Sequence, residues 1–449
     1  MLPLRADPQF PQQVMQLRLP SPLVLVMTAL GLVLQWLLCT VYVHVIAGYF
    51  TGSHLGGSSG GSEIPISYLM TAAATATCAL YCEGRAGPSR VIVIIQLVAI
   101  VIPLQSLLAA HFELAQPEFA AAVGLAYIGS LAFAGVMPDL RLPVMGTAPR
   151  VMLLIFAGLV SAYVYVTSIA SGALTHLSFN LATVYEVREE FFEHPAPLLG
   201  YLVPWQGYVL NPALMLIALA RRSLVLGAVG LAMQLLLFGM TGFRAFLFLP
   251  LLLLAVYLAG RRRNLMAAAL VGLLALIVVA LSLYAWLDEP LIPALLIDRV
   301  IVIPAEVHYW YYDYFGIHRQ APLQLSQSLF SFLSTSHYSA PVPEVIGWRY
   351  LGSAASANVG LFGDAFANFG FAGCGIFALL FALILKAIDA AADATDMRVA
   401  AALVAMPAFE LVNSGLLTTL LTHGLALTII VLWAFGSRAR GTEAAGARG

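Results

Sequence analysis

Residues 352–389 read GSAASANVGLFGDAFANFGFAGCGIFALLFALILKAID, and the two halves of this stretch differ sharply in character. The first half, 352–370, is small, polar and rich in glycine, and its one carboxylate is Asp364. The second half, 371–389, is an apolar run of about the length that crosses a bilayer as a helix. A helix that serves only as an anchor has no need of the first half. The polar strip therefore suggests a site where this helix meets the membrane surface.

Apolar runs of similar length recur along the whole chain of 449 residues. Hydrophobic residues make up 61% of the chain and charged residues only 10%, whereas soluble proteins carry about 25% charged residues. Only helices and closed barrels satisfy their backbone in lipid, and no alternating strand pattern is present. The composition predicts an all-α polytopic integral membrane protein, with residues 1–449 as a single membrane domain. The net charge of −1 gives no sign of a nucleic-acid partner.

We predict about twelve membrane-spanning helices from the apolar runs. They cover residues 22–50, 65–82, 91–110, 118–138, 151–172, 199–220, 223–240, 243–260, 265–287, 370–388, 398–415 and 418–436. The seventh and eighth are short and meet at the sequence TGFR, which favours a tight hairpin.

The basic residues provide a test of this topology, because cytoplasmic loops of membrane proteins are enriched in Lys and Arg. With both termini in the cytoplasm, all but five of the 21 basic residues fall in cytoplasmic segments. The five that fall on the outer face need another explanation, and they are Arg188, Arg244, Arg299, Arg319 and Arg349.

Two outer loops, 173–198 and 288–369, are expected to form the functional site. The second is far longer than ordinary connections, which are about 4–6 residues. It is also rich in Tyr, Trp, Phe and Ile, a composition that does not indicate disorder. We expect it to pack as interfacial helices on the outer membrane surface.

The segment 298–319, DRVIVIPAEVHYWYYDYFGIHR, combines acids, aromatics and arginine. Glu306, Trp310 and Asp313 share one helix face by their spacing, and Tyr311 lies beside them. Aromatic rings stack on the apolar faces of sugars, and carboxylates accept hydrogen bonds from sugar hydroxyls. An aromatic belt at the membrane interface explains the rings equally well. Both interpretations stay open at this point.

Arg244 in TGFR lies at the outer end of two spans, where an arginine costs about 2.5–3.5 kcal/mol unless it faces protein or ligand. Arginine binds phosphate through two parallel hydrogen bonds and does not lose its proton. The alternative is a packing pair with Glu410, which lies near the outer end of the eleventh predicted span. An acid inside the membrane is itself a functional candidate.

The remaining polar candidates give weaker signals. Residues 185–194, YEVREEFFEH, predict a solvated amphipathic surface helix, and an inward orientation of Arg188 stays open as the alternative. His308 and His337 are candidate general bases. The outer histidines are too scattered to define a metal site, and no cofactor is predicted. We interpret His423 as a satisfied core residue.

The order of these motifs resembles the Wzy-type polymerases that join the oligosaccharide repeat units of bacterial surface glycans. The resemblance is carried by Arg299-x4-Pro304-x-Glu306, by YWYYDYF, and by a long loop that ends in SANVGLFGDAFANFGFAG. The sequence TGFRAF at 241–246 resembles the family's motif of small residues and arginine between two adjacent spans. The resemblance covers about residues 150–440.

This resemblance implies a glycosyltransferase of GT-C-like architecture in the bacterial inner membrane, with its active site on the periplasmic face. Its partners would be undecaprenyl-pyrophosphate-linked glycans, the lipid bilayer and a chain-length regulator. The growing chain would leave its undecaprenyl pyrophosphate and join the incoming repeat unit. Neither a nucleotide sugar nor a metal nor another cofactor is required.

The resemblance also suggests roles for individual residues. Arginines would stabilise the departing pyrophosphate, and Glu306 would deprotonate the acceptor hydroxyl. The predicted catalytic residues are Glu306, Arg299, Arg244 and His337. The predicted substrate-binding residues are Arg188, Arg349, Arg319, His308, Trp310, Tyr311, Asp313, Asp364, Asn358 and Glu410.

The strip 352–370 has two interpretations in this scheme. It forms a close-packed wall whose missing side chains leave room for glycan or lipid phosphate, or it is a glycine-rich turn that allows close helix packing. Three rival functions also stay open: an O-antigen ligase, a lipid-linked oligosaccharide flippase or transporter, and a non-catalytic scaffold for polysaccharide export.

Overall fold

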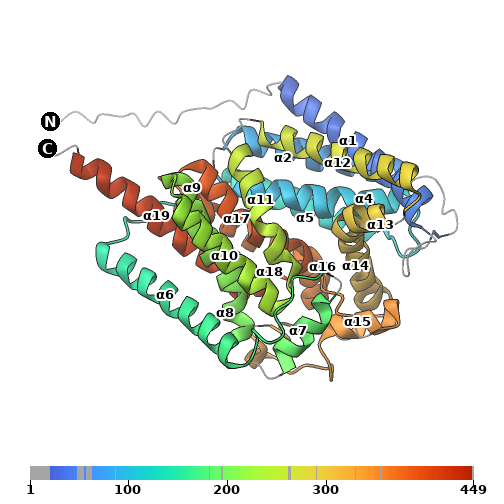
Figure 1. Cartoon of the computed structure of the whole chain (residues 1–449). Helices are drawn as coiled ribbons and strands as arrows, with labels where there is room; N and C mark the ends of the chain where they lie inside the picture. Colours follow the sequence, from blue (N-terminus) through green and yellow to red (C-terminus); the bar gives the residue numbers. More distant parts are fainter. Residues whose placement is uncertain are drawn as a thin grey trace, which may run out of the picture.

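The computed structural model describes residues 21–446, except 48–54, 57–62, 86, 182, 194–195, 261–263, 290, 329 and 354. The described part is helical, and its one β-type contact is an isolated bridge between Leu55 and Phe112 (Figure 1). Of the basic residues predicted to be cytoplasmic, those at 5, 18, 261–263 and 448 lie outside the described residues.

The first part of the chain forms eight apolar helices, which make up six spans, and one short helix. The short helix, α7, covers Val184–Glu193. The apolar helices are α1 (Pro22–Val41, continued by a π-helical turn, Tyr42–Ile46), α2 (Glu63–Glu83), α3 and α4 (Ser89–Gln96 and Ile102–Ala109, joined by the π-turn Leu97–Val101), α5 (Pro117–Val136), α6 (Thr147–Ala170), and α8 and α9 (Leu199–Trp205 and Asn211–Arg221, joined by the π-turn Gln206–Leu210).

The second part contains seven helices in the predicted spans and several in the long loop. Those in the spans are α10 (Leu224–Thr241), α11 (Arg244–Ala259), α12 (Leu265–Leu287), α16 (Leu361–Ala391), α17 (Met397–Asn413), α18 (Leu416–Leu421) and α19 (Leu425–Gly446). The loop contains α13 (Leu291–Pro293), α14 (Ile303–Tyr312), α15 (Val342–Leu351), the π-helical segments Ala294–Val302 and Asp313–Ile317, and a 3-10 turn (Ser331–Leu333).

Nine helices in the described part are long and apolar enough to cross a membrane, so the chain is a membrane-embedded helical protein. They correspond to nine of the twelve predicted spans. The other three predicted spans are shorter helices: α11, α17, and the pair α18 and α19. The predicted helix 418–436 is interrupted, because Gly424 has a φ of +77° and an added Cβ would lie 2.7 Å from Val209.

The centre of the bundle is formed by α3 and α17, which pack against each other. The run Val399–Ala408 of α17 is buried on every side. Five of its ten residues are alanine, and small side chains allow neighbouring helix backbones to approach closely. The helix α11 packs on the other side of α17, which connects the TGFR hairpin to the core.

The segment 291–317 differs from its expected position on the membrane surface. It is one continuous helical stretch, and α14 within it packs against α4 and α16 (Figure 1). Every residue from Pro304 to Asp313 is buried. The aromatic and aliphatic side chains that suggested an interfacial helix are instead buried among the spanning helices.

The glycine-rich strip also packs against protein. A Cβ added at Gly360 would lie 2.4 Å from the Val412 carbonyl oxygen, and one at Gly363 would lie 3.0 Å from the His308 ring. Missing side chains at these positions allow α16 to touch α17 and α14, as the helix-packing interpretation requires. The helix then breaks at Phe369 and Gly370, where Gly370 has φ +61° and ψ −149°.

Ion pairs hold together the end of the bundle where α16 finishes. The ammonium of Lys386 lies 2.6 Å from an Asp139 oxygen, and Lys386 is only 2% exposed. Arg85 lies 3.8 Å from Asp139 and 4.0 Å from Asp389. Asp389 also accepts hydrogen bonds from the backbone and hydroxyl of Ser89. The basic residues described here are therefore neutralised by carboxylates.

The helix α6 lies at the edge of the bundle (Figure 1). Only Val160, Val164 and Ser168 are buried, and they form a stripe with a spacing of four residues. Hydrogen bonds from Ser161 to Gln206 and from Tyr165 to the Met233 carbonyl support this stripe. Most of the surface of α6 is apolar and faces away from the protein.

Candidate active site

The hairpin between α10 and α11 places the first two arginines. Gly242 ends α10 with a φ of +65°, a conformation that favours glycine. A Cβ at Gly242 would lie 2.3 Å from the Val184 carbonyl oxygen, so α7 packs directly on this turn. Arg188 of α7 faces inward, the orientation that the sequence left open. Its guanidinium donates to the Gly242 carbonyl oxygen at 3.0 Å and lies 4.4 Å above the Phe243 ring.

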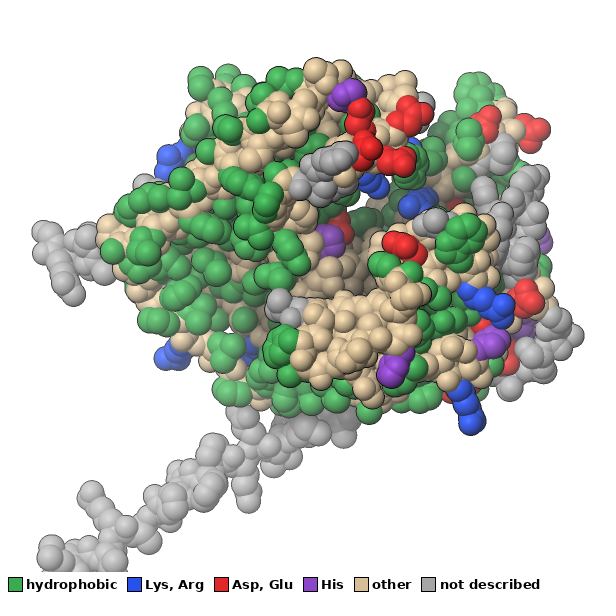
Figure 2. Space-filling model, turned by 90° about the horizontal axis from the view of Figure 1, so that it is seen from below, with side chains coloured by type: hydrophobic (Ala, Val, Ile, Leu, Met, Phe, Trp, Pro, Cys, Tyr) green, Lys and Arg blue, Asp and Glu red, His purple; other side chains and the backbone are tan. Residues whose placement is uncertain are grey.

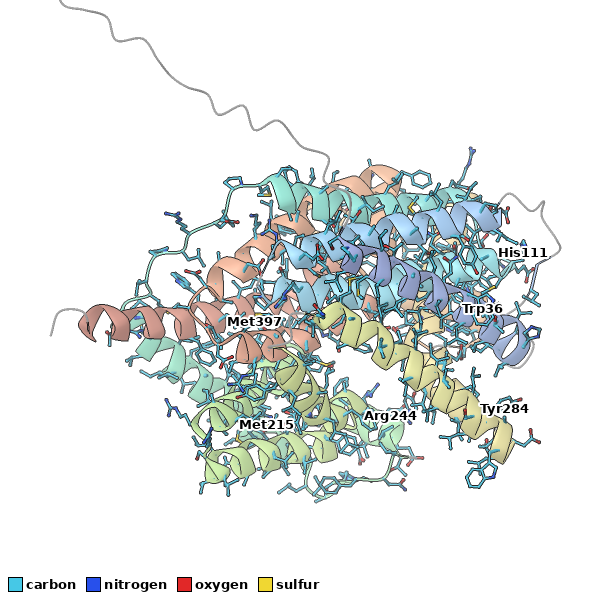
Figure 3. All side chains as sticks on the ribbon, turned by 90° about the horizontal axis from the view of Figure 1, so that it is seen from above. Trp36, His111, Met215, Arg244, Tyr284 and Met397 are labelled. Carbon is cyan, nitrogen blue, oxygen red and sulfur yellow. The ribbon has the colours of Figure 1, made fainter. Side chains whose placement is uncertain are left out.

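Arg244 opens α11 on the same turn, beside the ends of the two helices and away from Met215 of α9 (Figure 3). Its guanidinium donates to the Leu181 carbonyl oxygen at 3.1 Å and lies 5.1 Å from the centre of the Tyr185 ring. The alternative pairing with Glu410 is not found among the described residues, because Glu410 instead contacts His423 and Tyr208.

Arg299 comes from a different part of the chain, the π-helical segment before α14. Burial lowers the pKa of Arg188, and the charges of Arg244 and Arg299 lower it further. Arg188 is therefore within electrostatic range of both Arg244 and Arg299. We call Arg188, Arg244 and Arg299 the arginine cluster.

No carboxylate neutralises the arginine cluster. Among the described residues, no Asp or Glu oxygen lies within 4.0 Å of these three side chains. The Nε atoms of Arg188 and Arg244 are buried and also have no hydrogen-bond partner. Their guanidinium groups keep donors available, and fixed guanidinium groups are suited to a phosphate or pyrophosphate.

Three polar side chains meet beside this cluster. The Tyr208 hydroxyl donates a hydrogen bond to the Glu410 carboxylate, and Tyr208 is within electrostatic range of Arg188. His423 Nδ1 lies 3.8 Å from Glu410 Oε2 and has no hydrogen-bond partner. We call Glu410, Tyr208 and His423 the Glu410 group. His423 is thus not the satisfied core residue that the sequence suggested.

Figure 2 shows the face on which α7 and α15 lie, and this face is hollowed. Basic, acidic and histidine side chains line the hollow, and a patch of acidic side chains lies at its rim. This mixture of charges agrees with an arginine cluster beside a carboxylate and a histidine. The exposed acids Glu186, Glu189 and Glu190 of α7 lie on the helix face opposite Val184 and Val187.

Glu306, the predicted base, is buried. It is 1% exposed, and Tyr42 of the first helical span hydrogen-bonds to it. Asp298 is also near Tyr42, is 3% exposed, and its Oδ1 has no hydrogen-bond partner. Burial raises the pKa of Asp298 to about 7, opposed by Arg299. Glu306 therefore belongs to a buried polar group, whereas Arg299 is exposed.

Two aromatic residues predicted to bind sugar are buried. Trp310 is 2% exposed and stacks on Tyr350 at 5.7 Å between ring centres. Tyr311 is equally buried, and its hydroxyl donates to the Ala357 carbonyl oxygen. Neither ring face is open to a sugar in this structure. Burial also contradicts the interpretation of these rings as an aromatic belt at the membrane interface.

His308 is fully buried, with Nδ1 2.6 Å from the Pro304 carbonyl oxygen. Burial lowers its pKa to about 4. A buried imidazole of this kind packs α14 against α16 and does not reach the hollow. Gly363 lies against its ring.

Other predicted residues lie around the loop that carries α15. Asp313 accepts a hydrogen bond from the Tyr350 hydroxyl at 2.6 Å and lies 3.1 Å from His318. Arg349 is exposed and lies near Tyr350. Two further exposed residues are Arg319 and His337. Within the described part of the chain, no hydrogen bond or ion pair joins these residues to the arginine cluster.

Asp364 has a structural environment at the start of α16. Its side chain touches Gly415, where an added Cβ would lie 2.3 Å from Asp364 Oδ2. Asn368 donates to Asp364 Oδ1 at 3.1 Å and accepts from the Leu325 backbone at 2.7 Å. Asn358 is exposed, within 3.5 Å of the Ser356 hydroxyl.

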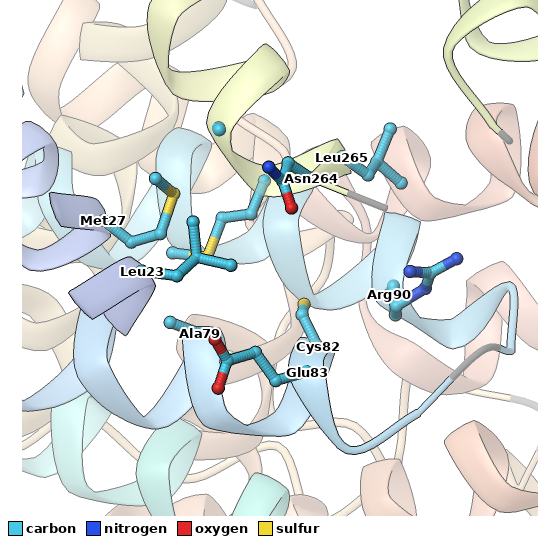
Figure 4. A pocket seen from close by; sticks show the side chains of 10 residues that line it. Leu23, Met27, Ala79, Cys82, Glu83, Arg90, Asn264 and Leu265 are labelled. Carbon is cyan, nitrogen blue, oxygen red and sulfur yellow. The ribbon is translucent and has the colours of Figure 1, made fainter. Parts of the chain in front are cut away.

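A separate small cavity is lined by Leu23, Cys82, Glu83, Arg90 and Asn264, with five other residues (Figure 4). Its volume of about 20 Å³ holds roughly one water molecule. It is therefore too small for a glycan. Within the described residues, no group of three or more His, Cys, Asp or Glu side chains is placed to hold a metal ion.

Sequence reasoning missed two members of the site. Tyr208 lies in the middle of an apolar span, and His423 lies in a turn that the sequence suggested was helix. Only the tertiary packing of α8–α9 and α17–α19 brings them to Glu410. A scan against protein-family models and searches of curated proteins and of solved structures found no match to this chain.

Proposed function

We propose that this protein is a membrane glycosyltransferase that joins undecaprenyl-pyrophosphate-linked oligosaccharide repeat units into a surface polysaccharide. The observation that carries the proposal is the arginine cluster. Arg188 lies near both Arg244 and Arg299, the three come from separate elements, and none of them forms an ion pair with a carboxylate among the described residues. Charge repulsion makes this arrangement unfavourable for packing alone, and an anionic ligand offsets it.

The departing pyrophosphate is the anion that this chemistry requires. As the donor glycan leaves its lipid carrier, negative charge develops on the pyrophosphate oxygens. Guanidinium groups fixed in place stabilise that charge with little reorganisation. Backbone contacts hold Arg188 and Arg244 in the structure, which is the kind of fixed geometry that such stabilisation needs.

Topology and location form part of the same proposal. The chain crosses a bacterial inner membrane twelve times in a GT-C-like arrangement, with both termini cytoplasmic and the arginine cluster at the periplasmic end. Support comes from the contrast between the two ends. Arg85 and Lys386 are paired with carboxylates, whereas Arg188, Arg244 and Arg299 are not.

A transporter or flippase of lipid-linked oligosaccharide is the second candidate. The observation that favours it is the break in α16 at Gly370, since many transporters bind substrate at broken helices. An O-antigen ligase uses the same donor chemistry and differs in its acceptor. These candidates predict different products in cells.

The test is the size profile of surface polysaccharide in cells that lack this gene, with and without the gene restored. A polymerase predicts single-repeat-unit caps that become long chains on complementation. A ligase predicts full-length polymer retained on the lipid carrier. A flippase predicts lipid-linked single units on the cytoplasmic leaflet, and that result would reject the proposal.

The same cells test the arginine cluster. Arg299→Ala should abolish long chains without preventing membrane insertion. Arg299 is exposed, so the substitution removes a charge from the arginine cluster and leaves the packing of the core unchanged. Protein abundance in the membrane fraction is the control. Near-normal polymer from this variant would reject the pyrophosphate assignment.

A further inference from the structure

We propose that Glu410 is the group that accepts the proton of the acceptor hydroxyl, and that Tyr208 and His423 position and recycle it. This inference rests on the proposed glycosyl transfer and names a residue for a step that the sequence assigned to Glu306. It is argued from the placement of the Glu410 group beside the arginine cluster.

Three separate elements build the Glu410 group. Glu410 projects from the last turns of α17, and Tyr208 comes from the π-turn between α8 and α9. His423 lies in the turn between α18 and α19, which Gly424 shapes with its positive φ. A π-turn and an interrupted helix both depart from regular helix geometry, and both departures place a polar side chain at the same carboxylate.

Tyr208 holds the carboxylate from one side. Its ring packs edge-on against Phe246 of α11, with 5.1 Å between ring centres, and its hydroxyl bonds to Glu410. Phe246 lies two residues after Arg244. The same hairpin that positions Arg244 therefore also fixes the ring that orients Glu410.

The arginine cluster is within reach of this carboxylate. Tyr208 bonds to Glu410 and interacts electrostatically with Arg188, so the carboxylate and this member of the cluster are both near one phenol group. A glycosyl transfer needs a proton acceptor on the acceptor side and positive charge on the leaving-group side. This spacing offers both without a direct ion pair that would neutralise them.

Packing does not explain the position of the His423 side chain. Its Nδ1 is buried without a hydrogen-bond partner and points within 3.8 Å of Glu410. An unpartnered buried nitrogen costs stability, because it loses its hydrogen bond to water without gaining another. Relay of a proton from Glu410 would account for a nitrogen in this position. The titratable and charged groups that face Glu410 are Tyr208, His423 and, across Tyr208, Arg188.

The proposed step transfers a proton from the acceptor and a glycan from the donor. The acceptor hydroxyl gives its proton to a Glu410 oxygen while its own oxygen forms a bond to the anomeric carbon of the donor glycan. The bond from that carbon to the pyrophosphate oxygen breaks, and its electron pair leaves with the pyrophosphate into the arginine cluster. Glu410 then passes the proton to His423, which releases it to water.

A second Tyr–Glu pair in this chain gives a matched control. The Tyr312 hydroxyl donates to Glu118 at 2.8 Å. Glu118 is exposed and forms no ion pair with an arginine or histidine of the described chain. If Glu410 served only as a hydrogen-bond acceptor for a tyrosine, Glu→Gln would have similar effects at both positions, because Gln also accepts that bond.

The experiment compares Glu410→Gln, Glu410→Asp, His423→Gln and Glu118→Gln as purified full-length proteins in lipid nanodiscs. Polymerisation of a lipid-linked repeat unit is followed across pH, and binding of inorganic pyrophosphate is measured separately. Proton transfer by a positioned side chain contributes about 10²–10⁴-fold. Glu410→Gln should lose that much rate and still bind pyrophosphate like the wild type.

The conservative variants separate catalysis from packing. Glu410→Asp should recover part of the rate with a displaced pH profile, and His423→Gln should be slower mainly at the higher pH values, where a neutral His423 accepts the proton, while Glu118→Gln stays at wild-type rate. Wild-type rate in Glu410→Gln, or loss of pyrophosphate binding together with rate, would overturn this inference and leave the proposed function standing. A wild-type protein that forms no polymer would overturn both.

Discussion

An arginine without a carboxylate partner is the residue-scale feature on which the proposed function depends. Arg188 and Arg244 each donate to a backbone carbonyl and lie over aromatic rings. Such contacts orient a guanidinium without cancelling its charge. The positive-inside rule identified these residues from the sequence, because it detects a charge on the disfavoured side of a membrane.

The local sequence does not show which distant residues contact the buried face of a helix. Glu306, Trp310 and Asp313 do lie on one helix, as their spacing predicted, but that helix is surrounded by protein. Helical periodicity gives the direction of a side chain relative to its own axis only. The partners Tyr42 and Tyr350 come from distant parts of the chain, and no local pattern predicts them.

Asp298 gives a prediction about pH at this scale. Burial raises its pKa from 3.8 to about 7, so the folded protein keeps a proton that the unfolded chain loses. This contribution to stability is complete below about pH 4 and is lost as pH rises through about 7. Asp298→Asn removes the titration, and at about pH 8 the variant should gain on the order of 4 kcal/mol relative to wild type.

The measurement is the unfolding midpoint of both proteins in detergent from about pH 5 to about pH 8. The difference between Asp298→Asn and wild type should grow in favour of the variant as pH rises. Curves that stay parallel over this range would show that Asp298 is not held in its neutral form by burial.

At the scale of elements, the turn between α10 and α11 controls the site. Gly242 has a positive φ and touches α7, so Gly242→Ala should both strain the turn and push α7 away. The backbone strain alone costs on the order of 1 kcal/mol. The displacement should also move Arg188 and Arg244 apart, and we expect at least about a tenfold loss of polymerisation, equivalent to about 1.4 kcal/mol.

Gly352 is a matched control for this substitution. It ends α15 with the same φ of +65°, and an added Cβ meets nothing within 4 Å. Gly352→Ala should therefore show the stability cost without the loss of activity. Equal activity losses in the two variants would mean that contact with α7 is not what matters at Gly242.

Sequence patterns predicted elements well where length and apolarity decide them. Nine spans and the TGFR hairpin have the expected positions. The segment 291–317 was placed incorrectly because its acids and aromatics are typical of an interface, and the sequence cannot show that Tyr42 and Tyr350 satisfy those acids inside the bundle. The interruption at Gly424 was missed because a single glycine does not usually end a helix.

At the scale of the whole molecule, the two ends of the bundle differ in how their charged residues are paired. One end uses Lys386, Arg85 and Asp389 in ion pairs that connect α2, α3 and α16. The other end gathers unpaired arginines and a hollowed surface. The sequence predicted basic residues on both faces of the membrane. Only the folded chain shows which of them form ion pairs with carboxylates.

The proposed topology predicts that these ends face different compartments. Single cysteines are introduced at Glu189 of α7 and at Arg221 of α9, both exposed, in a chain without its four native cysteines. A membrane-impermeant maleimide added to spheroplasts should label Glu189→Cys directly. It should label Arg221→Cys only after the membrane is permeabilised.

Labelling of both sites in intact spheroplasts would contradict the topology and with it the periplasmic position of the arginine cluster. A cysteine in a predicted cytoplasmic segment serves as the internal control. Its labelling only after permeabilisation shows that the membrane was intact.

The edge position of α6 has a consequence for how this sequence can diverge over evolutionary time. Its contact with the rest of the chain is the stripe of Val160, Val164 and Ser168, together with the hydrogen bonds from Ser161 and Tyr165. Selection for packing acts on that stripe. The remaining apolar positions of α6 meet lipid, so one aliphatic side chain can replace another there at little cost. Among descendants of this gene, α6 should accumulate neutral exchanges fastest, while α17 at the centre should change slowest.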